Sequence, residues 1–114
     1  MAKALSEIKK IIAAQSALDS AGIAPPSEAE RADFMDFLVV FGAGTSAGAV
    51  VIEEAHDPAY TGVWAVLATI TWAVTANKVF SARVVGGAHA IRARIGTAIV
   101  GGTVDVHFWA QKGD

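Results

Sequence analysis

Two long segments without a charged side chain follow each other in the middle of the chain. Residues 37–52 and 58–77 contain no Asp, Glu, Lys or Arg, and they are separated by a short polar stretch with Glu53, Glu54, His56 and Asp57. Two kinds of structure produce this pattern: paired strands in a β-sandwich, or a pair of membrane-spanning helices. The choice between them decides the compartment and the partners.

The period of the second segment favours strands. Trp64 and Ile70 belong to an apolar series at even positions, whereas Thr69 and Thr71 occupy odd positions, and this period of two is typical of a strand. A helix would scatter the threonines around its surface. The segment is long enough to cross a bilayer, which needs about 20 apolar residues. A small holin-like membrane protein is therefore the alternative to the sandwich.

The first segment and its flanks fit a membrane span poorly. Residues 37–52 contain three glycines, and no Lys or Arg lies between Arg31 and Lys78 to fix a topology. Further apolar runs alternate downstream and end at Gly-rich turns, as strands do. We predict strands at residues 37–41, 49–54, 63–71, 78–85, 88–95 and 103–109. This number and spacing predict a mainly β, antiparallel sandwich or barrel.

The N-terminal part has a different period and predicts a helix over residues 4–21. Leu5, Ile8, Ile12 and Leu18 are spaced by three, four and six residues, which places them on one apolar stripe. Pro25 and its neighbour Pro26 then break the chain, and the capping-box spacing of residues 27–30 predicts a short helix over residues 28–33. The first helix packs on its own domain, docks as an arm on a neighbouring subunit, or lies on a membrane surface. The predicted division is a helical arm with a Pro-Pro hinge at 1–33, a sandwich at 34–110 and a polar tail at 111–114.

The composition bears on partners. Hydrophobic residues make up 54% of the 114 residues and charged residues 18%, against about 25% charged in an average soluble domain. A domain of this size cannot bury so much apolar surface alone, so we predict a homo-oligomer, a dimer or a trimer. The net charge of −2 argues against direct nucleic-acid binding. A cleaved secretory leader is not expected, because the first residues lack an apolar run.

No catalytic motif stands out. The chain has no Gly-x-Ser-x-Gly elbow, and the glycines at residues 42–48 lack the spacing and the following helix of a dinucleotide site. Absence of cysteine removes disulfides and thiolate-bound metals. We therefore predict a protein that is not an enzyme, with no cofactor.

Polar clusters leave several interpretations open. Glu53, Glu54 and Asp57 form a solvated strand end, pair with arginines of another subunit, or bind a divalent cation, although their spacing matches no calcium loop. His56 and the two other histidines, His89 and His107, would form a zinc site only if the fold brought them together.

Aromatic and cationic residues suggest an interface. Trp64 and Trp72 share the parity of apolar neighbours and are expected in the core, whereas Trp109 alternates outward with Asp105 and His107. An outward Trp is a candidate interface anchor or a platform for a sugar. Arg92 and Arg94 share one face and are either solvated or interface cations. The candidate interface residues are Leu5, Ile8, Ile12, Leu18, Arg92, Arg94 and Trp109.

Four stretches together resemble small virion proteins of tailed bacteriophages. They are GAVVIEEA at 48–55, TGVWAVL at 61–67, AIRARI at 90–95 and GGTVDV at 101–106, and the resemblance covers about residues 39–110. It implies a jelly-roll-like sandwich in a capsid decoration (cement) protein or a head-fibre base, with no catalytic residues. The implied partners are sister subunits and the major capsid protein, with no membrane. The implied location is the capsid surface, after synthesis in the host cytoplasm. A carbohydrate- or receptor-binding virion module is the alternative.

Overall fold

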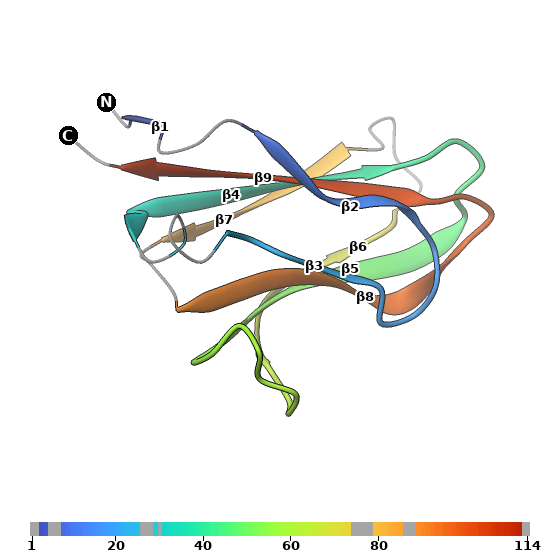
Figure 1. Ribbon diagram of the computed structural model, residues 1–114. Coiled ribbons are helices and arrows are strands. Elements are labelled where there is room, and N and C mark those ends of the chain that lie inside the picture. Colours follow the sequence, from blue (N-terminus) through green and yellow to red (C-terminus); the bar gives the residue numbers. More distant parts are fainter. Residues whose placement is uncertain are drawn as a thin grey trace.

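Two antiparallel sheets pack face to face in the computed structural model, which describes residues 3–4, 8–25, 29, 31–73, 79–85 and 89–112 (Figure 1). The first sheet, sheet A, contains β1 (Lys3–Ala4), β2 (Lys9–Gln15), β4 (Phe34–Phe41), β7 (Val79–Val85) and β9 (Val104–Lys112). The second, sheet B, contains β3 (Ala21–Ile23), β5 (Ala47–Ala55), β6 (Ala65–Thr71) and β8 (Ala90–Val100). The predicted antiparallel β-sandwich is confirmed.

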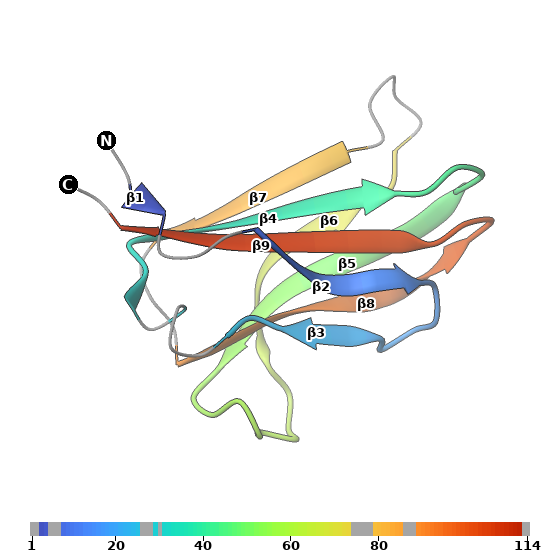
Figure 2. The same cartoon turned by 45° about the horizontal axis from the view of Figure 1, so that its top comes forward.

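The strands pair in a nested order. β2 pairs with β9, β3 with β8, β4 with β7 and β5 with β6. The two strands of a pair are therefore closer together in the sequence with each successive pair. The pairs β4–β9 and β5–β8 join these hairpin-like units into sheets. Sheet A therefore has the order β2-β9-β4-β7, with β1 extending β2 along the same side of β9, and sheet B has the order β3-β8-β5-β6 (Figure 2).

Alternating side chains from both sheets form the core. In β4 the odd-numbered residues are buried, and in β9 the even-numbered ones are, with Phe37 opposite Phe108 in the register and their ring centroids 5.2 Å apart. Sheet B contributes Ile52, Ile91 and Ile95, each fully buried. The period of two predicted for the strands that form β8 and β9 is confirmed, and Trp109 alternates with buried neighbours on the outer face of sheet A, as predicted.

The predicted N-terminal helical arm is wrong. Residues 9–15 form β2, whose backbone pairs with β9. Of the three stripe residues that the structure describes, Ile12 is buried, while Ile8 and Leu18 are 64% and 55% exposed. The pairing register shifts twice within β2, and Ala14 has a φ of +48°. These irregularities break the period of two, so the spacing of the apolar residues imitates a helix. Pairing with β9 satisfies the backbone, which overrides the helical pattern.

The remaining N-terminal predictions meet the structure in part. Leu5, and Glu28 and Glu30 of the predicted short helix, lie outside the described residues. Ala29 donates its backbone N–H to the carbonyl of Pro25, which is the spacing of one helical turn. Ala24 and Ala29 are fully buried in the core cluster.

Two glycine turns close one end of the sandwich. Gly44 and Gly101 have φ of +87° and +84°, a conformation that other residues rarely adopt. A Cβ on Gly44 would lie 2.7 Å from the backbone oxygen of Gly101, so the turns β4–β5 and β8–β9 pack against each other only with glycine at both positions. Within the described part of the chain, no helix has the length and apolar character needed to cross a bilayer.

Candidate functional site

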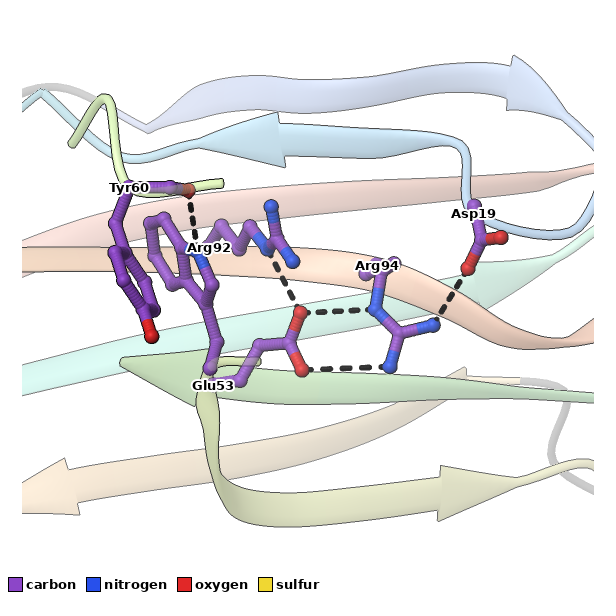
Figure 3. A network of polar contacts seen from close by, with 6 residues as sticks. Asp19, Glu53, Tyr60, Arg92 and Arg94 are labelled. Atoms are coloured by element: carbon purple, nitrogen blue, oxygen red, sulfur yellow. Dashed lines mark hydrogen bonds and ion pairs between the residues drawn. The ribbon is translucent and has the colours of Figure 1, made fainter. Parts of the chain in front are cut away.

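A buried carboxylate lies on the outer face of sheet B. Glu53 of β5 is 2% exposed and lies directly opposite Arg92 of β8 in the register. The Nε atom of Arg92 donates to Glu53 Oε1 at 2.7 Å, and the Nε atom of Arg94 donates to the same oxygen at 2.9 Å. Arg94 also donates from Nη2 to Glu53 Oε2 at 3.4 Å (Figure 3). We call Glu53, Arg92, Arg94 and Asp19 the Glu53 network.

Asp19 connects this network to the turn between β2 and β3. Its Oδ1 accepts a hydrogen bond from Arg94 Nη1 at 2.8 Å (Figure 3). Its backbone N–H donates to the carbonyl of Ile95. Asp19 has a φ of +68°, a strained backbone that surrounding contacts must hold in place. The network therefore fixes the turn that carries the chain from sheet A to sheet B.

The loop between β5 and β6 covers the other side of the network. The Arg92 guanidinium carbon lies 4.1 Å from the centroid of the Trp64 ring, which is a cation–π contact. Trp64 donates from Nε1 to the backbone carbonyl of Tyr60 at 2.9 Å (Figure 3). The Tyr60 ring lies 4.8 Å from that of His56. Trp64 is only 3% exposed. It was expected in the core, but it is buried against the outer face of sheet B instead.

The charges of the network stabilise one another. Burial alone would raise the pKa of Glu53, but the hydrogen bonds and positive charges of Arg94 and Arg92 outweigh it and hold that pKa below 4.5, the ordinary value. The hydrogen bond to Glu53 raises the pKa of Arg94, against the effect of burial. Glu53 therefore keeps its negative charge and Arg94 its positive charge at neutral pH, which strengthens the hydrogen bonds between them.

A depression of about 360 Å³ lies over the network. The four charged residues line its polar side, and its remaining lining consists of Gly62, Val63, Trp64 and Val66. Arg92 uses only its Nε in the network, so its two terminal nitrogens keep donor capacity. The depression thus offers guanidinium donors beside small apolar side chains. It has the components of a polar-ligand site.

A second buried carboxylate lies on the outer face of sheet A. Asp36 of β4 is 7% exposed and accepts two hydrogen bonds from Arg83 of β7, at 2.8 and 3.1 Å, and one from Gln111 of β9 at 3.1 Å. The hydrogen bond to Asp36 raises the pKa of Arg83. Arg83 also lies over the ring of Phe34, 5.3 Å from its centroid. The ion pair joins β7 to β4, and the hydrogen bond from Gln111 joins β9 to the same carboxylate.

The structure distributes the candidate interface residues over several places. Arg92 and Arg94 belong to the Glu53 network and Trp109 is half-buried on sheet A. Ile8 and Leu18 are exposed, and Ile12 is in the core. The interface role of these residues stays a prediction. The expectation of a solvated strand end is wrong for Glu53, which pairs with arginines of its own chain.

The histidines are not gathered at one point. His107 is on the outer face of sheet A, whereas His56 follows β5 and His89 precedes β8 at one end of sheet B. Among the residues that the structure describes, no group of three or more His, Asp and Glu side chains is placed to hold a metal ion.

Comparisons with known proteins do not assign a role to the Glu53 network. No family model matches the chain, and neither the curated proteins nor the solved structures contain a match.

Proposed function

We propose that this chain is a virion structural protein that binds and stabilises the capsid of a tailed bacteriophage. It would act without catalysis, as a homo-oligomer on the capsid surface, after synthesis in the host cytoplasm. Its partners would be sister subunits and the major capsid protein. The mechanism would be added interface area between neighbouring capsid subunits.

The observation that carries this proposal is the nested strand order. β2 pairs with β9, β3 with β8, β4 with β7 and β5 with β6. This nested pairing results when a long antiparallel hairpin is rolled into two four-stranded sheets. That arrangement supports the finer interpretation of the sandwich as a jelly roll, a fold that is common in viral capsid proteins. Fold alone does not determine function, so the resemblance of the four sequence stretches supplies the second support.

The apolar surface agrees with a role in assembly. Val63, Val85 and Val100 are 93%, 76% and 53% exposed. A partner chain that covered these side chains would remove their apolar surface from water. Removing apolar surface from water contributes about 25 cal/mol per Å², so a contact of about 300 Å² contributes about 7 kcal/mol before the costs of association. A decoration protein repeats such a contact at each equivalent position of the shell.

Co-expression tests the proposal. The chain is produced with the major capsid protein encoded in the same genome, and the assembled shells are separated on a density gradient. Recovery of the chain in the shell fractions at a fixed ratio to the capsid protein supports the proposal. Circular dichroism of the unbound material then shows whether it is folded. A folded chain that stays at the top of the gradient contradicts the proposal. Shells of an unrelated phage are the control for non-specific adhesion.

A carbohydrate- or receptor-binding module is the second candidate, and the depression over the Glu53 network favours it. Its terminal Arg92 nitrogens and carboxylates match the polar groups of a glycan, with Val63 and Val66 beside them. Glycan-array binding that is lost in Arg92→Lys but kept in Arg83→Lys would support this candidate. Absence of binding by a folded wild-type chain would remove it.

A further inference from the structure

β6 is an edge strand without a charged residue. Among the described residues its only paired neighbour is β5, so one side of its backbone presents unpaired N–H and carbonyl groups. Natural edge strands are commonly shielded by lysine, proline, bulges on the exposed side or short length. The β6 sequence AVLATIT contains no charged residue and no proline over seven residues, and its pairing with β5 shifts register once, between Ile52 and Glu53.

The other edges are protected. β2 carries Lys9 and Lys10 and has two register shifts in its pairing with β9. β3 is three residues long. β7, the edge of sheet A on the same side of the sandwich as β6, carries Arg83, which is paired with Asp36. Among the described strands, β2, β6 and β7 are edges of seven residues each, and β6 is the one without a charged residue.

Apolar side chains accompany this edge. Val66 and Leu67 of β6 are 55% and 40% exposed, and Val63, just before the strand, is 93% exposed. An exposed uncharged edge with adjacent apolar side chains is a template for another strand. The edge therefore supplies both backbone hydrogen-bonding groups and apolar area to one partner.

We propose that β6 pairs antiparallel with β6 of a second copy around a two-fold axis. Self-pairing is suited to this strand because it brings no like charges together, and a two-fold contact uses the same patch on both subunits and closes. The joined sheet would have the order β3-β8-β5-β6-β6-β5-β8-β3, with four strands from each copy. Growth stops there, because both outer edges are then the three-residue β3.

This inference names the self-contact of the proposed oligomer but does not depend on capsid binding. It is tested on the free protein, so its failure and that of the capsid proposal are distinguishable. Sedimentation equilibrium of the wild-type chain should give twice the chain mass of 11.7 kDa at high concentration, with reversible dissociation on dilution. A wild-type chain that stays monomeric into the millimolar range would overturn the proposal.

A pair of matched variants locates the contact. Leu67→Lys with Thr69→Lys adds two charges at exposed positions of β6, and Ser81→Lys with Val85→Lys adds two at exposed positions of β7. Four lysines facing each other across the β6 contact should raise the dissociation constant at least about tenfold. The β7 variant should dimerise like the wild type. Equal effects of the two variants, or a dimer unaffected by the β6 lysines, would contradict the assignment.

Salt and spectroscopy separate loss of the contact from loss of the fold. Raising the salt concentration screens like charges, so it should partly restore dimerisation of the β6 variant while leaving the wild-type constant nearly unchanged. The circular dichroism spectrum and melting temperature of the monomeric variant should match those of the β7 variant. An unfolded β6 variant would be replaced by Thr69→Lys alone, for which the same shift toward monomer is expected.

Discussion

Substitution of Glu53 by glutamine tests the Glu53 network most sharply. Glu53→Gln keeps the size of the side chain but removes the charge that Arg92 and Arg94 share, and it turns an amide group toward arginine donors. Three hydrogen bonds, at 2.7, 2.9 and 3.4 Å, lose their charged acceptor. Two guanidinium groups are then left together without a carboxylate between them.

The expected loss follows from the burial of the partners. Breaking a buried ion pair costs about 3–5 kcal/mol, but the Arg92 and Arg94 side chains are 24% and 25% exposed, so water compensates part of the loss. We expect the free energy of unfolding to fall by about 2–4 kcal/mol. For a chain of this length that corresponds to a fall in Tm of roughly 10 °C.

Urea denaturation at pH 7, followed by circular dichroism and tryptophan fluorescence, measures this loss. Glu54→Gln is the matched control, because Glu54 is the next residue, is half-buried and takes no part in the network. We expect the control to change the free energy of unfolding by less than about 0.5 kcal/mol. Equal stability of Glu53→Gln and Glu54→Gln would refute the argument that the arginine pair stabilises the fold through Glu53.

The pH dependence gives an independent readout of the same group. The pKa of Glu53 is below 4.5 in the folded chain, so the unfolded chain binds the proton first as the pH falls. The stabilisation is therefore present above pH 4.5 and is lost as the pH falls through the folded pKa. The difference in stability between wild type and Glu53→Gln should shrink below about pH 4.5. A difference that stays constant down to the acid limit of folding would contradict the lowered pKa.

Three further substitutions probe other parts of the fold. Asp36→Asn should lower the Tm less than Glu53→Gln does, because Arg83, the partner of Asp36, is half exposed. Thermal unfolding of both variants at one pH compares the two Tm values, and a larger fall for Asp36→Asn would contradict this reasoning. Phe37→Ala should cost about 3–5 kcal/mol in urea denaturation, since it removes the ring packed on Phe108 and leaves a cavity, and a loss below about 1 kcal/mol would place the core elsewhere. Gly22→Ala should lower stability by about 1–3 kcal/mol, because its Cβ would collide with the Ile11 carbonyl; unchanged stability would show that β2 and β3 do not approach so closely.

The sandwich could be predicted from the sequence because burial of one face imposes a period of two. In β9, Val104, Val106 and Phe108 alternate with Asp105 and His107, and the structure buries the first set and half-exposes the second. Such alternation is strong wherever a regular strand has one face in the core. β4 follows the same rule over most of its length, whereas β5 is buried on both faces over residues 48–53.

The N-terminal segment could not be predicted by the same rule. β2 is an irregular strand in which one residue, Ile12, is buried, so it has no alternating series from which a strand could be inferred. Ile8 and Leu18 completed a helical pattern by spacing alone. What makes the segment a strand is its pairing with β9, from Lys9 with Phe108 to Gln15 with Val104. Local propensity contains no information about so distant a partner.

The sequence alone does not predict the Glu53 network, for a related reason. The parity of the strands places Glu53 on the face opposite to the buried Ile52, and Arg92 and Arg94 on one face of their own strand, so their type and facing were available. Their meeting depends on the pairing of β5 with β8, across 39 and 41 residues, and Asp19 is 75 residues from Arg94. A search for opposite charges on the outward faces of neighbouring strands would find the contact once the strand order is known.

The most direct test of the proposed function is a density map of shells assembled with and without this chain. Shells are produced from the major capsid protein of the same genome, and single-particle electron cryomicroscopy is performed on both preparations. The capsid proposal predicts extra density at symmetry-related positions on the outer surface, only when the chain is present, with the shape of a two-sheet sandwich. Identical maps, obtained in the presence of a folded chain in excess, would contradict it.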